Sequence, residues 1–377
     1  MKSAASAAVA ATLAATAFAW FLLRADSQGE IALLIALAVV AGVLAARVKS
    51  LRIAAAPERL TGGLAIAAVV VLALLLREDD FSLLLIARIL IVIVACLGLN
   101  VQFGYAGVVN FAGASFFGIG GYTAAVLSRS TGMPHLLTLL CGGAAAALIG
   151  TVLLLPVLRT RGHYAALVTI AFALLFRTFL EVNDTLGGPQ GLKLRELVIG
   201  PWHFNDPVAI GWFEGSFYLR YVALALVLVV VFFALVQRLE RSFIGIALDA
   251  VRLDEIAARS FGLDVARWKI AAFTLGNFIT GVAGALSAFM IGFIAPNSYT
   301  FAESLILVSI LLLGGIGNPW GLSLATAIVI LLPEKLQVIQ EYRFLLFAAM
   351  VILILLFRPA GLVPRPPRRL GGLGRRA

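Results

Sequence analysis

The sequence predicts an all-α, polytopic membrane protein of about 10–12 transmembrane helices. Three observations support this fold class: 62% of the 377 residues are hydrophobic, only 13% are charged, and apolar runs of spanning length recur along the whole chain. Ordinary soluble domains carry roughly 25% charged residues, so a soluble enzyme and a disordered chain are excluded. The net charge of +10 must be located along the chain before it can indicate a partner.

The candidate spans follow from the length of the apolar runs, since a helix needs about 20 residues to cross the hydrocarbon core. They lie near residues 4–23, 31–46, 62–76, 81–99, 106–127, 135–158, 163–182, 217–237, 269–293, 303–314, 321–333 and 343–357. The first run follows Lys2 and is either a retained helix or a signal peptide. The lack of a clear Ala-x-Ala cleavage site before Arg24 favours a retained helix.

The basic residues predict the orientation of the chain. With the N-terminus in the cytoplasm, 19 of the 29 basic residues fall in cytoplasmic segments, as the positive-inside rule requires. Both termini are then cytoplasmic, and the basic excess indicates topology and no nucleic-acid partner. The same count requires a chain break over 314–319, where Gly and Pro interrupt helices; a re-entrant loop over 303–333 is a variant.

Two connecting segments are long. The external loop 183–216 is rich in Gly, Pro and Trp, whereas the internal loop 238–268 has helical periodicity. We expect one helix in the internal loop, capped by Ser242 and stopped by Gly262, with Asp264 capping the next helix. Because its charges are nearly balanced, a groove on another protein fits this helix better than lipid headgroups, which are the alternative.

The segment from Gly245 to Lys269 resembles the cytoplasmic coupling loop of branched-chain amino acid ABC permeases of the LivM type. Other blocks resemble that family in the same order along the chain. They are Leu99–Gly107 continuing through Phe116–Thr123, the turn Gly187–Gly191, and Leu313–Gly317 ahead of Leu332–Glu334 and Phe357–Leu362. Several blocks in family order are far more specific than any single glycine motif.

The resemblance implies a domain organisation. A permease core similar to type II ABC importers would cover residues 81–363, with the external loop 183–216 and the cytoplasmic coupling loop 238–268. Residues 1–80 would be an N-terminal extension of about three spans, and residues 364–377 a basic cytoplasmic tail. The expected location is the bacterial cytoplasmic (inner) membrane.

The resemblance also implies a function, the ATP-driven import of branched-chain or related amino acids. The implied partners are two cytoplasmic ABC ATPases that carry ATP and Mg, a second homologous permease of the LivH type, a periplasmic or lipoprotein substrate-binding protein, and membrane lipid. None of the five lysines follows a glycine, so the chain lacks a P-loop and is expected to be a transport subunit with no cofactor, metal or catalytic residue. A permease for urea, amides or aromatic acids is the alternative, and a stand-alone secondary transporter is a further one.

Two groups of residues are candidate sites. Coupling to the ATPase is implied by resemblance for Gly245, Asp254, Glu255, Ala258, Arg259 and Gly262. The translocation pathway is predicted to involve Gly104, Tyr105, Gly107, Asn110, Phe116, Gly118, Gly120, Tyr122, Gly314, Gly315 and Gly317. Their glycines each weaken a helix by about 1 kcal/mol relative to alanine, which fits either a broken helix beside the pathway or close helix packing.

Two departures from the family pattern bear on these sites. Many relatives carry a Gly-His pair where this chain has Ala112-Gly113-Ala114, which bears on the substrate, and relatives often carry a basic residue in place of Asp249. Among the polar residues inside spans, Arg177 and Glu181 are expected to pair with each other, and Arg88 to snorkel or find a partner across helices. Asn277 is expected to form a hydrogen bond between helices.

Overall fold

The computed structural model describes most of the chain. The described residues are 2–25, 30, 58–158, 164–200, 202–210, 213–335, 342, 345, 348–349, 352, 356 and 361–365. The predicted span 31–46, most of the predicted span 343–357 and nearly all of the basic tail lie outside them. Two compact units are present: residues 1–90, 204–227 and 330–341 form the first, and residues 91–203, 228–329 and 342–377 the second.

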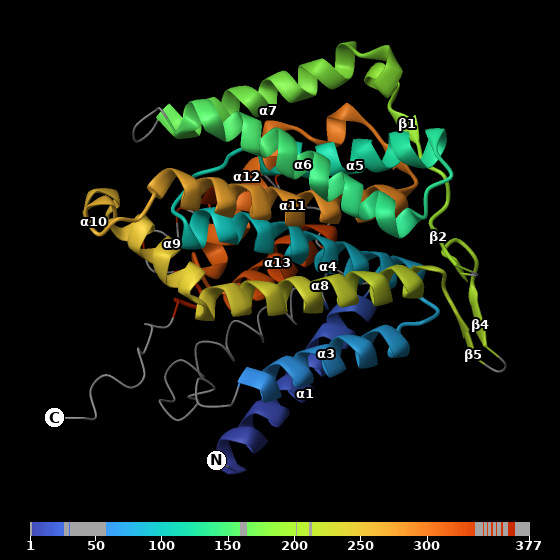
Figure 1. The fold of residues 1–377 in the computed structure, drawn as a ribbon. Coiled ribbons are helices and arrows are strands. Elements are labelled where there is room, and N and C mark those ends of the chain that lie inside the picture. Colours follow the sequence, from blue (N-terminus) through green and yellow to red (C-terminus); the bar gives the residue numbers. More distant parts are fainter. Residues whose placement is uncertain are drawn as a thin grey trace. The chain divides into compact units, whose positions relative to one another are not determined.

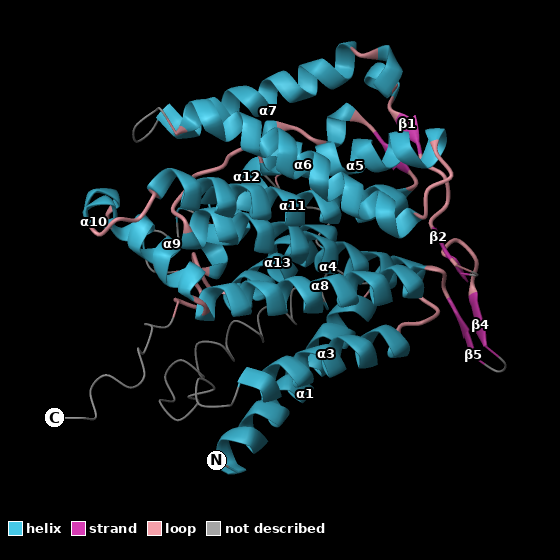
Figure 2. Ribbon diagram, viewed as in Figure 1, coloured by secondary structure: helices cyan, strands magenta, loops and turns pink. Residues whose placement is uncertain are grey.

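Long apolar helices make up most of the described chain (Figure 2), which confirms the all-α fold class. In chain order they are α1 (Lys2–Arg24), α3 (Glu58–Leu75), α4 (Asp80–Asn100), α5 (Gly113–Ser130), α6 (His135–Val157), α7 (Tyr164–Val182), α8 (Tyr218–Arg241), α9 (Phe243–Leu253), α10 (Glu255–Ser260), α11 (Val265–Ile291), α12 (Phe301–Gly314) and α13 (Pro319–Lys335). Within the described ranges, 5 helices are long and apolar enough to cross a membrane, or up to 6 if a bent pair counts as one span.

Short irregular elements connect the helices. They comprise the π-helix η2 (Val101–Tyr105), the 3-10 helices η3 (Asp184–Leu186), η4 (Gly188–Gln190) and η5 (Pro296–Ser298), and the strands β1 (Leu192–Lys193), β2 (Val198–Ile199), β3 (Trp202–His203), β4 (Val208–Ile210), β5 (Phe213–Gly215) and β6 (Phe293–Ile294). The strands pair antiparallel as β1–β6, β2–β3 and β4–β5. The Gly187–Gly191 turn forms with positive φ angles of 84° at Gly187 and 75° at Gly191, which glycine adopts without strain.

In the first unit, α1 packs against α3. Leu22 and Ala25 at the end of α1 are buried against Phe18 and Leu331. The Lys335 ammonium donates to the carbonyl oxygen of Leu23 at 2.5 Å, so a cation at the C-terminal end of α13 also caps the end of α1.

In the second unit, α11 packs against both α5 and α6 (Figure 1). Glycines permit this approach: a Cβ at Gly120 of α5 would overlap the carbonyl oxygen of Gly281 in α11, and one at Gly284 would overlap the carbonyl oxygen of Phe117. Small residues allow helix backbones to come close where lipid supplies no hydrophobic drive between helices.

The predicted span 106–127 is wrong at its start. The preceding helix α4 runs on into η2, and a helix begins again only at Gly113. Gly107 has a positive φ of 67°, and the Asn110 side chain accepts a hydrogen bond from the Ala112 amide at 2.9 Å. Both features favour a turn over a continuous helix.

The predicted break over 314–319 is confirmed. Helix α12 ends at Gly314, Gly315 and Gly317 have φ angles of 105° and 85°, and α13 starts at Pro319. The Asn318 side chain accepts from the Trp320 amide at 3.0 Å, as an N-terminal cap does.

Candidate functional site

The two breaks in the second unit meet each other. The Gly317 amide donates to the side-chain oxygen of Asn100 at 2.9 Å. Asn100 is the residue directly before η2. A Cβ at Gly104 would lie 2.8 Å from the nitrogen of Gly317, so the two predicted pathway glycines are in backbone contact. Such interrupted helices are tolerated in a membrane only where protein groups satisfy the freed backbone.

A cluster of buried amide side chains lies beside η2. The Gln102 side chain donates to the side-chain oxygen of Asn277 in α11 at 2.9 Å and accepts from the Asn110 side chain at 2.7 Å. All three residues are fully buried. The predicted interhelical hydrogen bond of Asn277 is therefore confirmed, and its partner Gln102 was not among the predicted residues.

The remaining pathway candidates on α5 lie in packed surroundings. The Phe116 ring stacks on Phe172, with centroids 5.4 Å apart. A Cβ at Gly118 would lie 2.9 Å from the Tyr299 ring, and Gly120 is the residue that contacts Gly281. These contacts are those expected from the close-packing interpretation of the glycines, and any role in the pathway stays a prediction.

Tyr122 has a different environment from the other candidates on α5. It is 4% exposed and lines an apolar cavity of about 300 Å³ between α5, α6 and α7. Its hydroxyl is buried and has no hydrogen-bond partner among the described residues.

The internal loop folds as two helices, so the prediction of one continuous helix is wrong. Asp254 is extended, with φ −155° and ψ 109°, and its carboxylate accepts from the Ile256 and Ala257 amides at 2.8 and 3.0 Å. An aspartate that caps a new helix ends the preceding one. Ser242 occupies the N-cap position of α9, as predicted, but its side chain does not bond to the helix amides; its hydroxyl donates to the Leu239 carbonyl at 2.7 Å instead.

Several predicted features of this loop are confirmed. Gly262 has a φ of 80° and ends α10, and Asp264 accepts from the Arg267 amide at 3.2 Å at the start of α11. Glu255 lies 3.9 Å from Arg259 and 2.5 Å from the Lys269 ammonium. The buried face of the loop brings Val251, Ala258 and Val265 together; Gly245 is also buried, in α9.

The outer face of the loop is apolar. Leu253, Ile256 and Phe261 are 77%, 80% and 88% exposed. They lie next to Asp254 and Gly262, in the segment that resembles a coupling loop. Large exposed apolar side chains gathered on one segment mark interaction sites.

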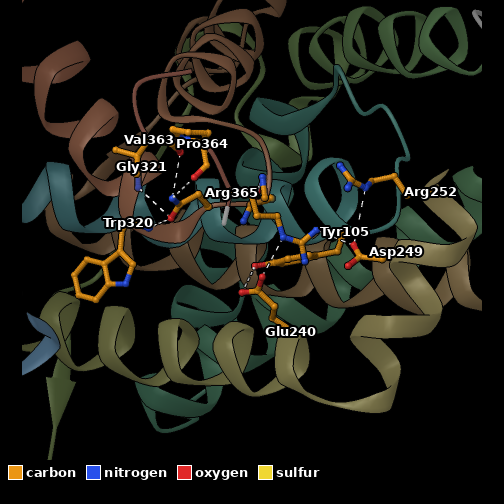
Figure 3. A network of polar contacts seen from close by, with 12 residues as sticks. Tyr105, Glu240, Asp249, Arg252, Trp320, Gly321, Val363, Pro364 and Arg365 are labelled. Carbon is orange, nitrogen blue, oxygen red and sulfur yellow. Dashed lines mark hydrogen bonds and ion pairs between the residues drawn. The ribbon is translucent and has the colours of Figure 1, made fainter. Parts of the chain in front are cut away.

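An arginine from the C-terminal segment joins several elements of the second unit (Figure 3). The Arg365 guanidinium donates to Asp249 of α9 at 2.7 Å and to Glu240 of α8 at 3.0 Å. It also lies over the Tyr105 ring of η2 at 4.6 Å, and the Tyr105 hydroxyl donates to Glu240 at 3.2 Å. Burial alone would lower the pKa of Arg365, but its bonds to Asp249 and Glu240 raise this pKa above the ordinary value, so Arg365 remains charged.

The charged residues expected within spans have partners. Arg177 donates to Glu181 at 2.8 Å, as predicted. Arg88 pairs with Glu334 across helices at 2.5 Å, which confirms a partner and identifies it. Among the described residues, no group of three or more His, Cys, Asp or Glu side chains is placed to hold a metal ion.

These features define a class: a polytopic membrane subunit with interrupted helices and an exposed, apolar loop suited to a partner. Comparison with known proteins identifies the family. Residues 81–355 match the family of the branched-chain amino acid transport system / permease component. The chain belongs to this family and is a permease component of an ABC transport system.

Three relatives illustrate the similarity. The chain is 36% identical over 297 residues to the high-affinity branched-chain amino acid transport system permease protein LivM of Escherichia coli K12, which covers 74% of this chain and 70% of the relative. It is 24% identical over 323 residues to a probable LivM permease of Methanocaldococcus jannaschii, covering 73% and 90%. It is also 24% identical over 285 residues to the LivH permease of Escherichia coli K12, covering 72% and 90%. No solved structure is significantly similar.

Proposed function

We propose that this chain is the LivM-type permease subunit of an importer for branched-chain amino acids. In this proposal it pairs with a LivH-type permease, two ABC ATPases that bind ATP and Mg, and an external substrate-binding protein. It lies in the bacterial inner membrane with both termini in the cytoplasm. The names of the relatives, both branched-chain amino acid permeases, support the substrate class.

One observation carries the coupling part of the proposal: Leu253, Ile256 and Phe261 project from a loop whose other face is packed into the second unit. An amphipathic helical segment that leaves apolar side chains exposed fits a groove on a partner protein. The partner is the ATPase, because an importer without a P-loop needs an external source of ATP energy.

The mechanism follows from where the loop is attached. Helix α9 leads from α8, and α10 leads through Gly262 into α11. Closure of the ATPases would move α9 and α10 together as a lever on α11, which carries Asn277 of the buried amide cluster. The breaks at Gly104–Gly107 and Gly314–Gly317 are the places where the backbone can rearrange, so we assign the alternating-access movement to them.

Reconstitution tests this function. Proteoliposomes that contain this chain, its homologous permease, both ATPases and the binding protein are expected to accumulate radiolabelled leucine when ATP is inside. Parallel assays with urea, acetamide and phenylalanine test the alternative substrates. Accumulation by this chain alone, driven by an ion gradient and without ATP, would instead establish a secondary transporter.

A surface variant tests the docking site. Ile256→Asp places a charge in the exposed apolar face and is expected to reduce co-purification of the ATPase by about tenfold, because an unpaired charge in an interface is costly. Trp202→Asp is the matched control, since Trp202 is also apolar and 65% exposed but lies in β3 of the predicted external loop. Equal co-purification with both variants would place the ATPase elsewhere.

A further inference from the structure

The segment 361–365 is hydrogen-bonded to the break between α12 and α13. The Leu362 amide donates to the Leu313 carbonyl at 2.8 Å, and the Val363 amide donates to the Gly314 carbonyl at 3.2 Å. The Asn318 side chain donates to the carbonyl oxygens of Val363 and Pro364 at 3.1 and 3.4 Å. The same asparagine caps α13, so this segment and the helix break share one set of hydrogen bonds.

From this position the Arg365 side chain reaches three further elements. It contacts Tyr105 on η2, Glu240 at the end of α8 and Asp249 on α9. The side chain is only 12% exposed, and those of the two carboxylates are 23% and 16% exposed. Ion pairs this well shielded are screened little by solvent, and removing one partner leaves the others uncompensated.

We propose that Arg365 is a positioning residue that transmits the movement of the coupling helix α9 to both helix breaks. Among the described partners of the Arg365 side chain, Asp249 lies on α9 and Tyr105 lies on η2. The segment that carries Arg365 is bonded to Leu313 and Gly314 at the α12–α13 break. A shift of α9 therefore either carries Arg365 with it or breaks its bond to Asp249. In both cases the contacts of Arg365 with η2 and with the α12–α13 break are altered. This inference rests on the proposed coupling function.

The network also accounts for the acidic residue at position 249. Its carboxylate lies 2.7 Å from Arg365 and 3.9 Å from Arg252, and its side chain is mostly buried. The negative charge of Asp249 is thus compensated by arginines of the same chain. A basic residue at 249 would face Arg365 at close range and repel it.

The test compares coupling in the reconstituted complex. Arg365→Gln removes the charge. Asp249→Asn neutralises the partner of Arg365 on α9, together with its longer pair to Arg252, while Glu240 and Tyr105 keep their contacts with Arg365. The measured quantity is the amount of leucine imported per ATP hydrolysed, with co-purification of the ATPase as the readout of assembly. Arg267→Gln is the matched control. The Arg267 side chain is 86% exposed, and within the described part of the chain its ion pair is with Asp264.

We expect both network variants to assemble and to import less leucine per ATP, by about tenfold for Arg365→Gln and about threefold for Asp249→Asn. Arg365→Lys should lie between Arg365→Gln and the wild type, since lysine keeps the charge but lacks the fork that reaches two carboxylates. The control is expected to match the wild type. Wild-type coupling in both network variants overturns the proposal, and so does joint loss of assembly and import, which would make the network purely structural. A wild-type complex that imports no leucine would instead contradict the proposed function.

Discussion

The contact between α5 and α11 gives a quantitative prediction for Gly120→Ala. Alanine gains about 1 kcal/mol of helix propensity over glycine. Its Cβ, however, would overlap the Gly281 carbonyl oxygen and lie 2.6 Å from the carbonyl carbon and 2.7 Å from the Cα. A carbon and a carbonyl oxygen in close contact between helices need about 3.3–3.6 Å, so the helices must move apart by more than about 1 Å. The contacting atoms belong to the Gly281 backbone, so no side-chain rotation can relieve the overlap.

Overpacking of this kind costs about 1–3 kcal/mol, and we expect the upper end because a separation of 1 Å also weakens neighbouring contacts. After the gain in propensity, the net loss of unfolding free energy is about 2 kcal/mol. The assay is SDS-titrated unfolding of the purified protein in mixed micelles, followed by circular dichroism.

Gly63→Ala is the matched control, because no described atom beyond the neighbouring backbone of α3 lies within 4 Å of a Cβ at this exposed position. This variant is expected to be unchanged or stabilised by up to about 1 kcal/mol. If Gly120→Ala proves as stable as Gly63→Ala, the close-packing account of the glycines in α5 is refuted.

Three further predictions concern polar contacts. Asn277→Leu removes the nearer acceptor of the buried Gln102 amide and leaves it only the Phe273 carbonyl at 3.4 Å among the described residues. It should lower the unfolding free energy by about 1–3 kcal/mol in the same SDS titration; an unchanged midpoint would contradict the cluster. Asp254→Ala removes the cap of α10 and should destabilise it by about 1 kcal/mol, seen as faster hydrogen exchange of α10 amides with α9 unaffected. Glu334→Gln should destabilise the protein more than the double variant with Arg88→Met, because the single change leaves an unpaired charge; the reverse order in SDS titration would argue that the pair has no role.

The sequence was sufficient for the features that depend on composition and local chemistry. Apolar runs gave most of the helices, because spanning length and low charge leave few alternatives. Gly262, Asp264 and the glycines after α12 were predicted from their conformational preferences alone. The Arg177–Glu181 pair was predictable because helix geometry brings residues i and i+4 together.

The features that depend on distant contacts could not be predicted. Nothing in the local sequence joins Arg365 to Glu240 and Asp249, and Arg365 was read as part of a basic tail. Arg88 was expected to need a partner, but its neighbours could not identify Glu334, which lies 246 residues away. The split of the coupling loop was missed because Asp254 fits the polar face of one helix as well as the cap between two.

The most direct test of the proposed coupling is to measure whether the coupling loop contacts the ATPase. Phe261→Cys, in a chain whose Cys96 and Cys141 are replaced by alanine, places a single thiol at the 88%-exposed end of α10. In the assembled, leucine-importing complex this thiol is expected to cross-link to the ATPase subunit, with a yield that changes on ATP binding, while Trp202→Cys in the same background should not cross-link to it. Import of leucine by a complex in which the thiol at 261 never cross-links to the ATPase would contradict the account.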